Sequence, residues 1–134
     1  MTIRIGLLRH LAKVAPGRSV NFSQVLAVYR EKADRARLVA AQRISEAVAQ
    51  RVALREFSIR SLEIASEWRI ADNGVDFDWS QIRDTYRSDP KRLEMAIWSN
   101  ERLCGMGIGL LSSASLELRF LEGCPDPNCP LIGR

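Results

Sequence analysis

Three cysteines are the residues of this chain whose types and spacing most readily suggest chemistry. Cys124 and Cys129 are separated by four residues, a spacing that could supply half of a zinc site. A structural zinc site needs four ligands, and the chain has no second pair of cysteines or histidines to complete the set. Together with Cys104 the cysteines are odd in number, which favours reduced thiols over a disulfide framework. The sequence therefore predicts no metal site.

A repeat of glycine at every second position, Gly105, Gly107 and Gly109, is the next unusual pattern. In a strand, residues two apart share a face, so the three glycines would lie together. Glycine weakens a strand, and its use here suggests that a helix or a ligand closely approaches the backbone. The sequence leaves both explanations open. The repeat lies inside a predicted strand, so it is not a dinucleotide-binding turn.

Positive charge is concentrated in the N-terminal half of the chain. Residues 1–70 contain 13 Lys and Arg against 6 Asp and Glu, whereas residues 71–134 contain 7 against 10. A basic region can attract nucleic acid or an acidic protein surface. Acidic residues are interleaved with these arginines, and no aromatic residues alternate with them to stack on bases. The pattern favours a solvated helix face over a nucleic-acid site, although it leaves nucleic acid possible.

Length and composition indicate one α+β domain that spans residues 1–134. The chain is 46% hydrophobic and 27% charged, which is ordinary for a globular protein. No apolar run is long enough to cross a bilayer, and the N-terminus lacks the apolar core of a secretory signal. We expect a cytoplasmic protein with no membrane partner.

Residues 1–55 are expected to be mainly helical, and residues 56–134 to form a sheet. The stretch from Phe22 to Ala53 contains no Pro or Gly and is rich in good helix formers, which predicts a long helix. Its alanine-rich stripe suits close packing against another helix or a partner chain. Aromatic and β-branched residues from Phe57 to Ile64 favour a strand, although their alternation is imperfect.

The rest of the chain predicts a short helix followed by three antiparallel strands. A turn is expected over 71–74, and Asp78 can cap a helix that ends before Pro90. Apolar residues then alternate over Leu93–Ile97, Arg102–Leu111 and Ser115–Glu122, with a hairpin turn at 99–101. The fold class expected is therefore α+β with a small antiparallel sheet.

The stretch from Asp78 to Arg134 resembles the GNAT-type N-acetyltransferases, in a branch found in bacteria and phages. Residues Leu93–Gly105 resemble the central hairpin of that superfamily, and Leu118–Arg134 resemble the strand and loop that follow. The resemblance covers this stretch in order and spacing, whereas the helical half is similar only in general character. It implies an incomplete GNAT-like fold, because the sequence stops where the next helix would begin.

The resemblance implies acetyl-CoA as the cofactor. The strand near 116–121 would line the cofactor cleft, and the loop after it would offer backbone N–H groups to the pyrophosphate at a helix start. The implied cofactor-binding residues of this sequence are Leu121, Glu122, Gly133 and Arg134. Since the helix is not in the sequence, we expect the 134 residues alone to bind acetyl-CoA weakly and to be inactive.

Acetyl transfer needs a base near the amine, and the resemblance leaves three carboxylates as candidates: Glu94, Glu117 and Glu122. Each is better explained as a solvated carboxylate on a strand, because the sequence gives no geometry that brings it to a substrate.

Two functions stay open at this point. The chain could be acetyltransferase-related and need a partner or a further segment for catalysis. It could instead be a non-catalytic protein-binding or inhibitory module, of a kind that a mobile element could carry. In either case the strand Ser115–Glu122 would lack a neighbour that a complete acetyltransferase provides. We therefore expect a homodimer or a protein partner, unless the segment Met1–Leu11 covers that edge.

Overall fold

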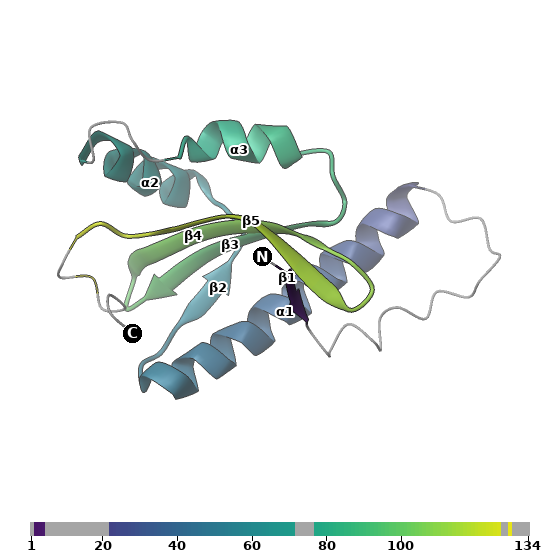
Figure 1. Ribbon diagram of the computed structural model, residues 1–134, viewed down its shortest axis with the longest axis horizontal. Coiled ribbons are helices and arrows are strands. Elements are labelled where there is room, and N and C mark those ends of the chain that lie inside the picture. The colour runs from purple at the N-terminus through teal and green to yellow at the C-terminus, as the bar shows by residue number, and fades with distance from the viewer. Residues whose placement is uncertain (1, 5–21, 72–76, 127–128, 130–134) are drawn as a thin grey trace.

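The computed structural model describes residues 2–4, 22–71, 77–126 and 129, and within them it contains five strands and three helices. The strands form one antiparallel sheet in the order β1-β5-β4-β3-β2. Helices α2 (Ile59–Ala71) and α3 (Trp79–Tyr86) cover one face of the sheet, and α1 (Phe22–Val48) crosses the other (Figure 1). The predicted α+β class is confirmed. The strands are β1 (Thr2–Arg4), β2 (Ala53–Arg55), β3 (Arg92–Ser99), β4 (Arg102–Leu111) and β5 (Ser115–Gly123).

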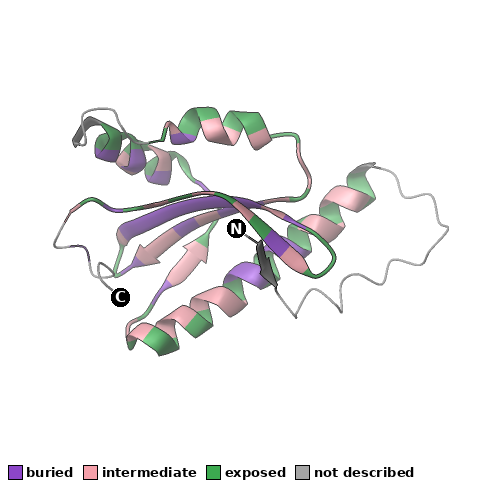
Figure 2. Cartoon of the chain, viewed as in Figure 1, coloured by how far each residue is buried: buried purple, intermediate pink, exposed green. Residues whose placement is uncertain are grey.

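The three C-terminal strands form the predicted meander, with β4 at the centre. A tight turn joins β3 to β4, and both of its central residues, Asn100 and Glu101, have positive φ angles of 49° and 63°. Positive φ at both positions is the signature of the hairpin turn that matches the natural twist of paired strands. Because β4 has a partner on each side, it is almost entirely buried (Figure 2).

The sheet is wider than its C-terminal pattern alone indicates, because the N-terminal half contributes both outer strands. On one side β2 pairs with β3, with Leu54 opposite Ile97. On the other side β1 pairs with the first residues of β5, with Thr2 opposite Glu117. Three-residue strands carry too little alternation to be recognised in a sequence, so neither was predicted.

The strand predicted over Phe57–Ile64 is wrong, because the chain enters helix α2 at Ile59. The cause is a local cap at the start of the helix. The Ser61 N–H donates to the Ser58 hydroxyl at 3.1 Å, and the Ser58 N–H donates to the Ser61 hydroxyl at 2.8 Å. This reciprocal pair satisfies helix-start donors as a capping box does. The buried residues Ser61, Ala65 and Trp68 then follow helical spacing.

The other helix predictions are confirmed. The Asp78 carboxylate accepts from the Gln81 N–H at 3.2 Å, which caps α3, and α3 ends at Tyr86, before Pro90. The long helix ends at Val48, and the next residue, Ala49, adopts a left-handed φ of 51° that stops it. The turn predicted over 71–74 falls mostly outside the described residues.

The core lies on both faces of the sheet. Under α2 and α3 it includes Phe57, Trp68, Trp79, Met106 and Ile108. On the other face the alanine-rich stripe of α1 packs on the sheet itself, with Ala33 and Ala36 joining a cluster with Leu93, Leu111 and Leu116. The small alanine side chains let α1 approach the strands closely.

The three glycines of β4 face side chains of the neighbouring strands. A methyl group added at Gly105 would lie 3.1 Å from Ile97 Cδ1 of β3, and one at Gly107 would lie 3.2 Å from Met95 Cε. A methyl group at Gly109 would lie 2.6 Å from Leu116 Cδ1 of β5. Larger side chains of β3 and β5 therefore cover the backbone of β4 at the three glycines. The sequence left open whether a helix or a ligand approaches this backbone; among the described residues, side chains of the two neighbouring strands do.

Candidate functional site

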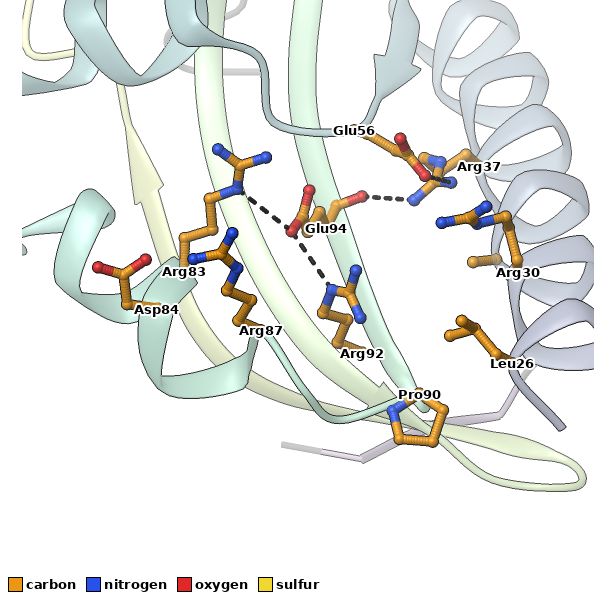
Figure 3. Close-up of a pocket in the computed structure, with 11 residues that line it drawn as sticks. Leu26, Arg30, Arg37, Glu56, Arg83, Asp84, Arg87, Pro90, Arg92 and Glu94 are labelled. Atoms are coloured by element: carbon orange, nitrogen blue, oxygen red, sulfur yellow. Dashed lines mark hydrogen bonds and ion pairs between the residues drawn. The ribbon is translucent and has the colours of Figure 1, made fainter. Parts of the chain in front are cut away.

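A cleft rich in arginine lies between α1, α3 and the start of β3 (Figure 3). Its volume is about 340 Å³. We call it the arginine cleft and define it by its lining residues: Leu26, Arg30, Ala33, Arg37, Glu56, Arg83, Asp84, Arg87, Pro90, Arg92 and Glu94.

Regular secondary structure places these side chains on facing walls. On α1, the lining residues from Leu26 to Arg37 recur at intervals of three and four and so share one face of the helix. On the opposite wall Arg83 and Arg87 follow one another by one helical turn at the end of α3. The floor comes from β3, where Arg92 and Glu94 are two apart and share a face of the sheet.

Glu94 is the central group of the cleft and is 7% exposed. Its Oε1 accepts from the Phe57 N–H at 3.0 Å, which ties β3 to the segment that enters α2. Its Oε2 lies 3.5 Å from Arg92 Nε and 3.9 Å from Arg83 Nε. A buried carboxylate is stable only when it is paired and hydrogen-bonded, and these three neighbours supply both conditions.

Arg37 fixes the α1 wall and is 5% exposed. Its guanidinium donates to the Glu94 carbonyl oxygen at 2.9 Å and to the carboxylates of Asp34 and Glu56 at 2.7 and 3.4 Å. One buried arginine therefore bridges α1, the residue after β2, and β3. On the same helix Lys32 is also buried, and desolvation lowers the pKa of its ammonium group, which lies 4.8 Å from the Tyr29 ring centre.

Two arginines of the cleft differ from the others. Within the described part of the chain, the guanidinium groups of Arg30 on α1 and of Arg87 beyond the end of α3 have neither an ion-pair partner nor a hydrogen-bond partner, although the Arg87 backbone N–H donates to the Asp84 carbonyl oxygen at 3.3 Å. Figure 3 shows the Arg30 side chain extending from α1 toward the space between the two walls, and the Arg87 guanidinium beside Arg83 on the α3 wall, where the Asp84 carboxylate lies farther from α1. The cleft is therefore electropositive where it is open.

The predicted site residues do not form one cluster. Of the three candidate bases, only Glu94 lies in the arginine cleft. Glu117 is exposed on β5 and pairs with Arg119 at 3.1 Å. Glu122 accepts from the Trp79 indole N–H at 2.9 Å and from the Phe77 N–H at 3.4 Å, so it holds the start of α3 against β5.

The predicted cofactor-binding residues do not form one cluster either. Leu121 is 55% exposed and neighbours Gly107 on the face that α1 crosses. Glu122 is engaged by α3 as described. Gly133 and Arg134 lie outside the described residues.

The outer edge of β5 is only partly covered. The strand β1 pairs with Ser115–Glu117, and residues 118–123 have no strand on that side within the described ranges. An N-terminal segment thus covers this edge, as the sequence allowed, but only along three residues of β5. We call residues 118–123 the open edge.

Cys104, near the start of β4, comes together with Cys124 and Cys129, which follow the end of β5. All are buried and free, and the Cys124 N–H donates to the Cys104 carbonyl at 2.9 Å. Burial raises the pKa of the Cys104 thiol to about 12 and also raises that of Cys124, so neither is a ready nucleophile at neutral pH. Among the described residues, no group of three or more His, Cys, Asp or Glu could hold a metal ion.

The sequence did not indicate the arginine cleft. Its walls come from segments about fifty residues apart, and only the fold brings Arg30 together with Arg87. The available signal was the helical spacing, since Arg30 and Arg37 are two turns apart and Arg83 and Arg87 one turn apart.

No helix of the described residues is long and apolar enough to cross a lipid bilayer. The chain matches no protein-family model, no curated protein and no solved structure.

Proposed function

We propose that this chain is related to the GNAT-type N-acetyltransferases and acts only after another chain extends its sheet. The open edge of β5 carries the proposal. The resemblance to these acetyltransferases implies that the strand near 116–121 borders the acetyl-CoA cleft and pairs with a further strand. In the described residues that position is occupied only beside Ser115–Glu117.

The occupant that we propose for the open edge is a second copy of this chain. Unpaired strand N–H and C=O groups are a template for another strand. A two-fold axis perpendicular to the sheet through Leu121 would pair the two open edges antiparallel and set the two Leu121 side chains opposite one another. Leu121 is 55% exposed, so this contact would remove a large apolar side chain from water.

A non-catalytic binding module is the second candidate, and one observation favours it. The carboxylate of Glu122, which the resemblance assigns to the cofactor, is already engaged by Trp79 and Phe77. Glu94 is similarly surrounded by Phe57, Arg83 and Arg92. A carboxylate whose oxygens are already occupied by structural donors is poorly placed to take a proton from a substrate, because a general base must reach that proton directly. The same open edge would then serve only to bind protein.

Calorimetry with acetyl-CoA separates the two candidates when it is run above and below the concentration at which the chain pairs with itself. For the unpaired chain both candidates predict no binding tighter than the millimolar range, because Glu122 is engaged and Leu121 lies at an unfinished edge. The paired chain should bind acetyl-CoA more tightly if it is acetyltransferase-related, and no more tightly if it is only a binding module. Micromolar binding by the unpaired chain would show that it forms a cofactor site unaided and would contradict the proposed dependence on a partner.

Hydrogen exchange tests the open edge directly. If a second copy pairs there, outward-pointing amides of residues 118–123 become protected as the protein concentration rises, whereas the already paired amides of β4 do not change. Protection that does not depend on concentration would contradict pairing at this edge.

A further inference from the structure

The arginine cleft contains more positive charge than its own acids neutralise. Five arginines and three carboxylates line it. Arg37 is balanced by Asp34 and Glu56, while Arg83 and Arg92 share Glu94. The guanidinium groups of Arg30 and Arg87 remain, one on each wall, without a partner among the described residues, and the third lining carboxylate, Asp84, forms no ion pair with either of them. These two charges, which no carboxylate of the described residues neutralises, favour an anion in the cleft.

The internal ion pairs hold the cleft in shape before any ligand arrives. Glu94 is buried and anchors the arginines of the floor and the α3 wall, and Arg37 is buried and anchors α1 to β3. Arg30 and Arg87 are themselves exposed, as Arg43 is, so their side chains are ordered only when a ligand binds. They extend, however, from walls that the ion pairs already hold in place, so binding has to order these side chains and not the cleft as a whole.

The geometry also narrows the class of ligand. A guanidinium group presents a planar fork of donors that fits the oxygens of a phosphoryl group. The volume of about 340 Å³ is at the small end of the range for small-molecule sites. Among the described residues, no aromatic side chain lines the cleft, so this part of the chain offers no ring on which a base could stack. A concave site that lacks such a surface suits a compact phosphorylated molecule better than a nucleic-acid strand.

We propose that the arginine cleft is a binding site for the phosphoryl group of a small molecule, with Arg30 and Arg87 as the groups that contact it. This inference is independent of the open edge and of any relation to acetyltransferases. It needs no assembly, since both walls belong to one chain.

Calorimetric titration with inorganic pyrophosphate at fixed ionic strength tests the site. We expect the wild-type chain to bind with a dissociation constant below the millimolar range. Replacing either Arg30→Gln or Arg87→Gln should weaken binding about tenfold, because each removes one charge-assisted contact. The matched control is Arg43→Gln, which removes an exposed charge from the same helix outside the cleft and should leave binding unchanged. Circular dichroism checks that all variants keep the helix content of the wild type.

Several outcomes would overturn the proposal. One is a wild-type chain that does not bind pyrophosphate, and another is equal weakening by Arg43→Gln, which would mean general charge attraction. A third is tighter binding of a single-stranded oligonucleotide that Arg30→Gln and Arg87→Gln abolish, which would reassign the cleft to nucleic acid. Failure here leaves the acetyl-CoA and hydrogen-exchange results unaffected, so the two proposals fail separately.

Discussion

Replacing Gly109 with alanine tests how β4 packs against β5. The added methyl group would lie 2.6 Å from Leu116 Cδ1 and 2.7 Å from the Glu117 carbonyl oxygen. Leu116 is 4% exposed and belongs to the core cluster beneath α1, so it has little room to turn away. The carbonyl oxygen belongs to the backbone of the paired strand and moves only if the pairing itself shifts. We therefore expect the two strands to separate locally.

The size of the effect follows from two opposing contributions. Overpacking a well-filled core costs typically about 1–3 kcal/mol. Replacing glycine with alanine restricts the unfolded chain and returns about 0.4–1 kcal/mol. The net loss for Gly109→Ala is then about 1–2 kcal/mol. With a urea slope of about 1.5 kcal/mol/M for a domain of this size, the unfolding midpoint falls by roughly 1 M.

The assay is urea unfolding followed by circular dichroism. Gly123→Ala is the matched control, because nothing lies within 4 Å of the methyl group that it would add at the end of β5. That variant should be as stable as the wild type or slightly more stable. If Gly109→Ala unfolds at the same urea concentration as Gly123→Ala, the packing described for β4 and β5 is incorrect.

Two further predictions concern buried polar groups. Glu94→Gln removes the negative charge that Arg83 and Arg92 share. Because both arginines keep access to water, we expect the free energy of unfolding, measured in urea, to fall by about 1–3 kcal/mol. An unchanged free energy of unfolding would mean that Glu94 does not organise the cleft. Burial raises the pKa of the Cys104 thiol from 9.0 to about 12. The protonated thiol therefore contributes its full stabilisation to the folded state below pH 9, and this contribution is lost as the pH rises from about 9 to 12. Cys104→Ala should therefore flatten the alkaline decline in unfolding free energy, and an equally steep decline in wild type and variant would contradict the assignment.

Strong local patterns determined how much of the fold could be predicted from the sequence. In the long helix α1 and in the strands β3 to β5, apolar residues recur many times at a constant spacing, so these elements were predicted. Helix α3 was predicted because Asp78 is a recognisable cap. Helix α2 was mistaken for a strand because its reciprocal Ser58–Ser61 cap is a weaker signal than the β-branched residues that follow. The short strands β1 and β2 exist only through pairing with β5 and β3.

The candidate site was less predictable than the fold. Glu94 was named as a candidate base through the acetyltransferase resemblance, but the residues that surround it could not be predicted. Arg30, Arg87 and Glu94 belong to three different elements, and only tertiary packing brings them to one cleft. The exposure of Leu121 likewise depends on which elements cover its face of the sheet, which no local pattern encodes.

Light scattering at micromolar concentration tests the central claim, that a second copy pairs with the open edge of β5. The account predicts a species of twice 15.1 kDa for the wild type. Leu121→Lys should convert it to a monomer, because two like charges would face one another across the pair. Leu38→Lys introduces the same change at an exposed leucine of α1, 73% exposed, and should leave the dimer intact. A wild-type mass of 15.1 kDa, or a dimer that Leu38→Lys dissociates and Leu121→Lys does not, would contradict the claim.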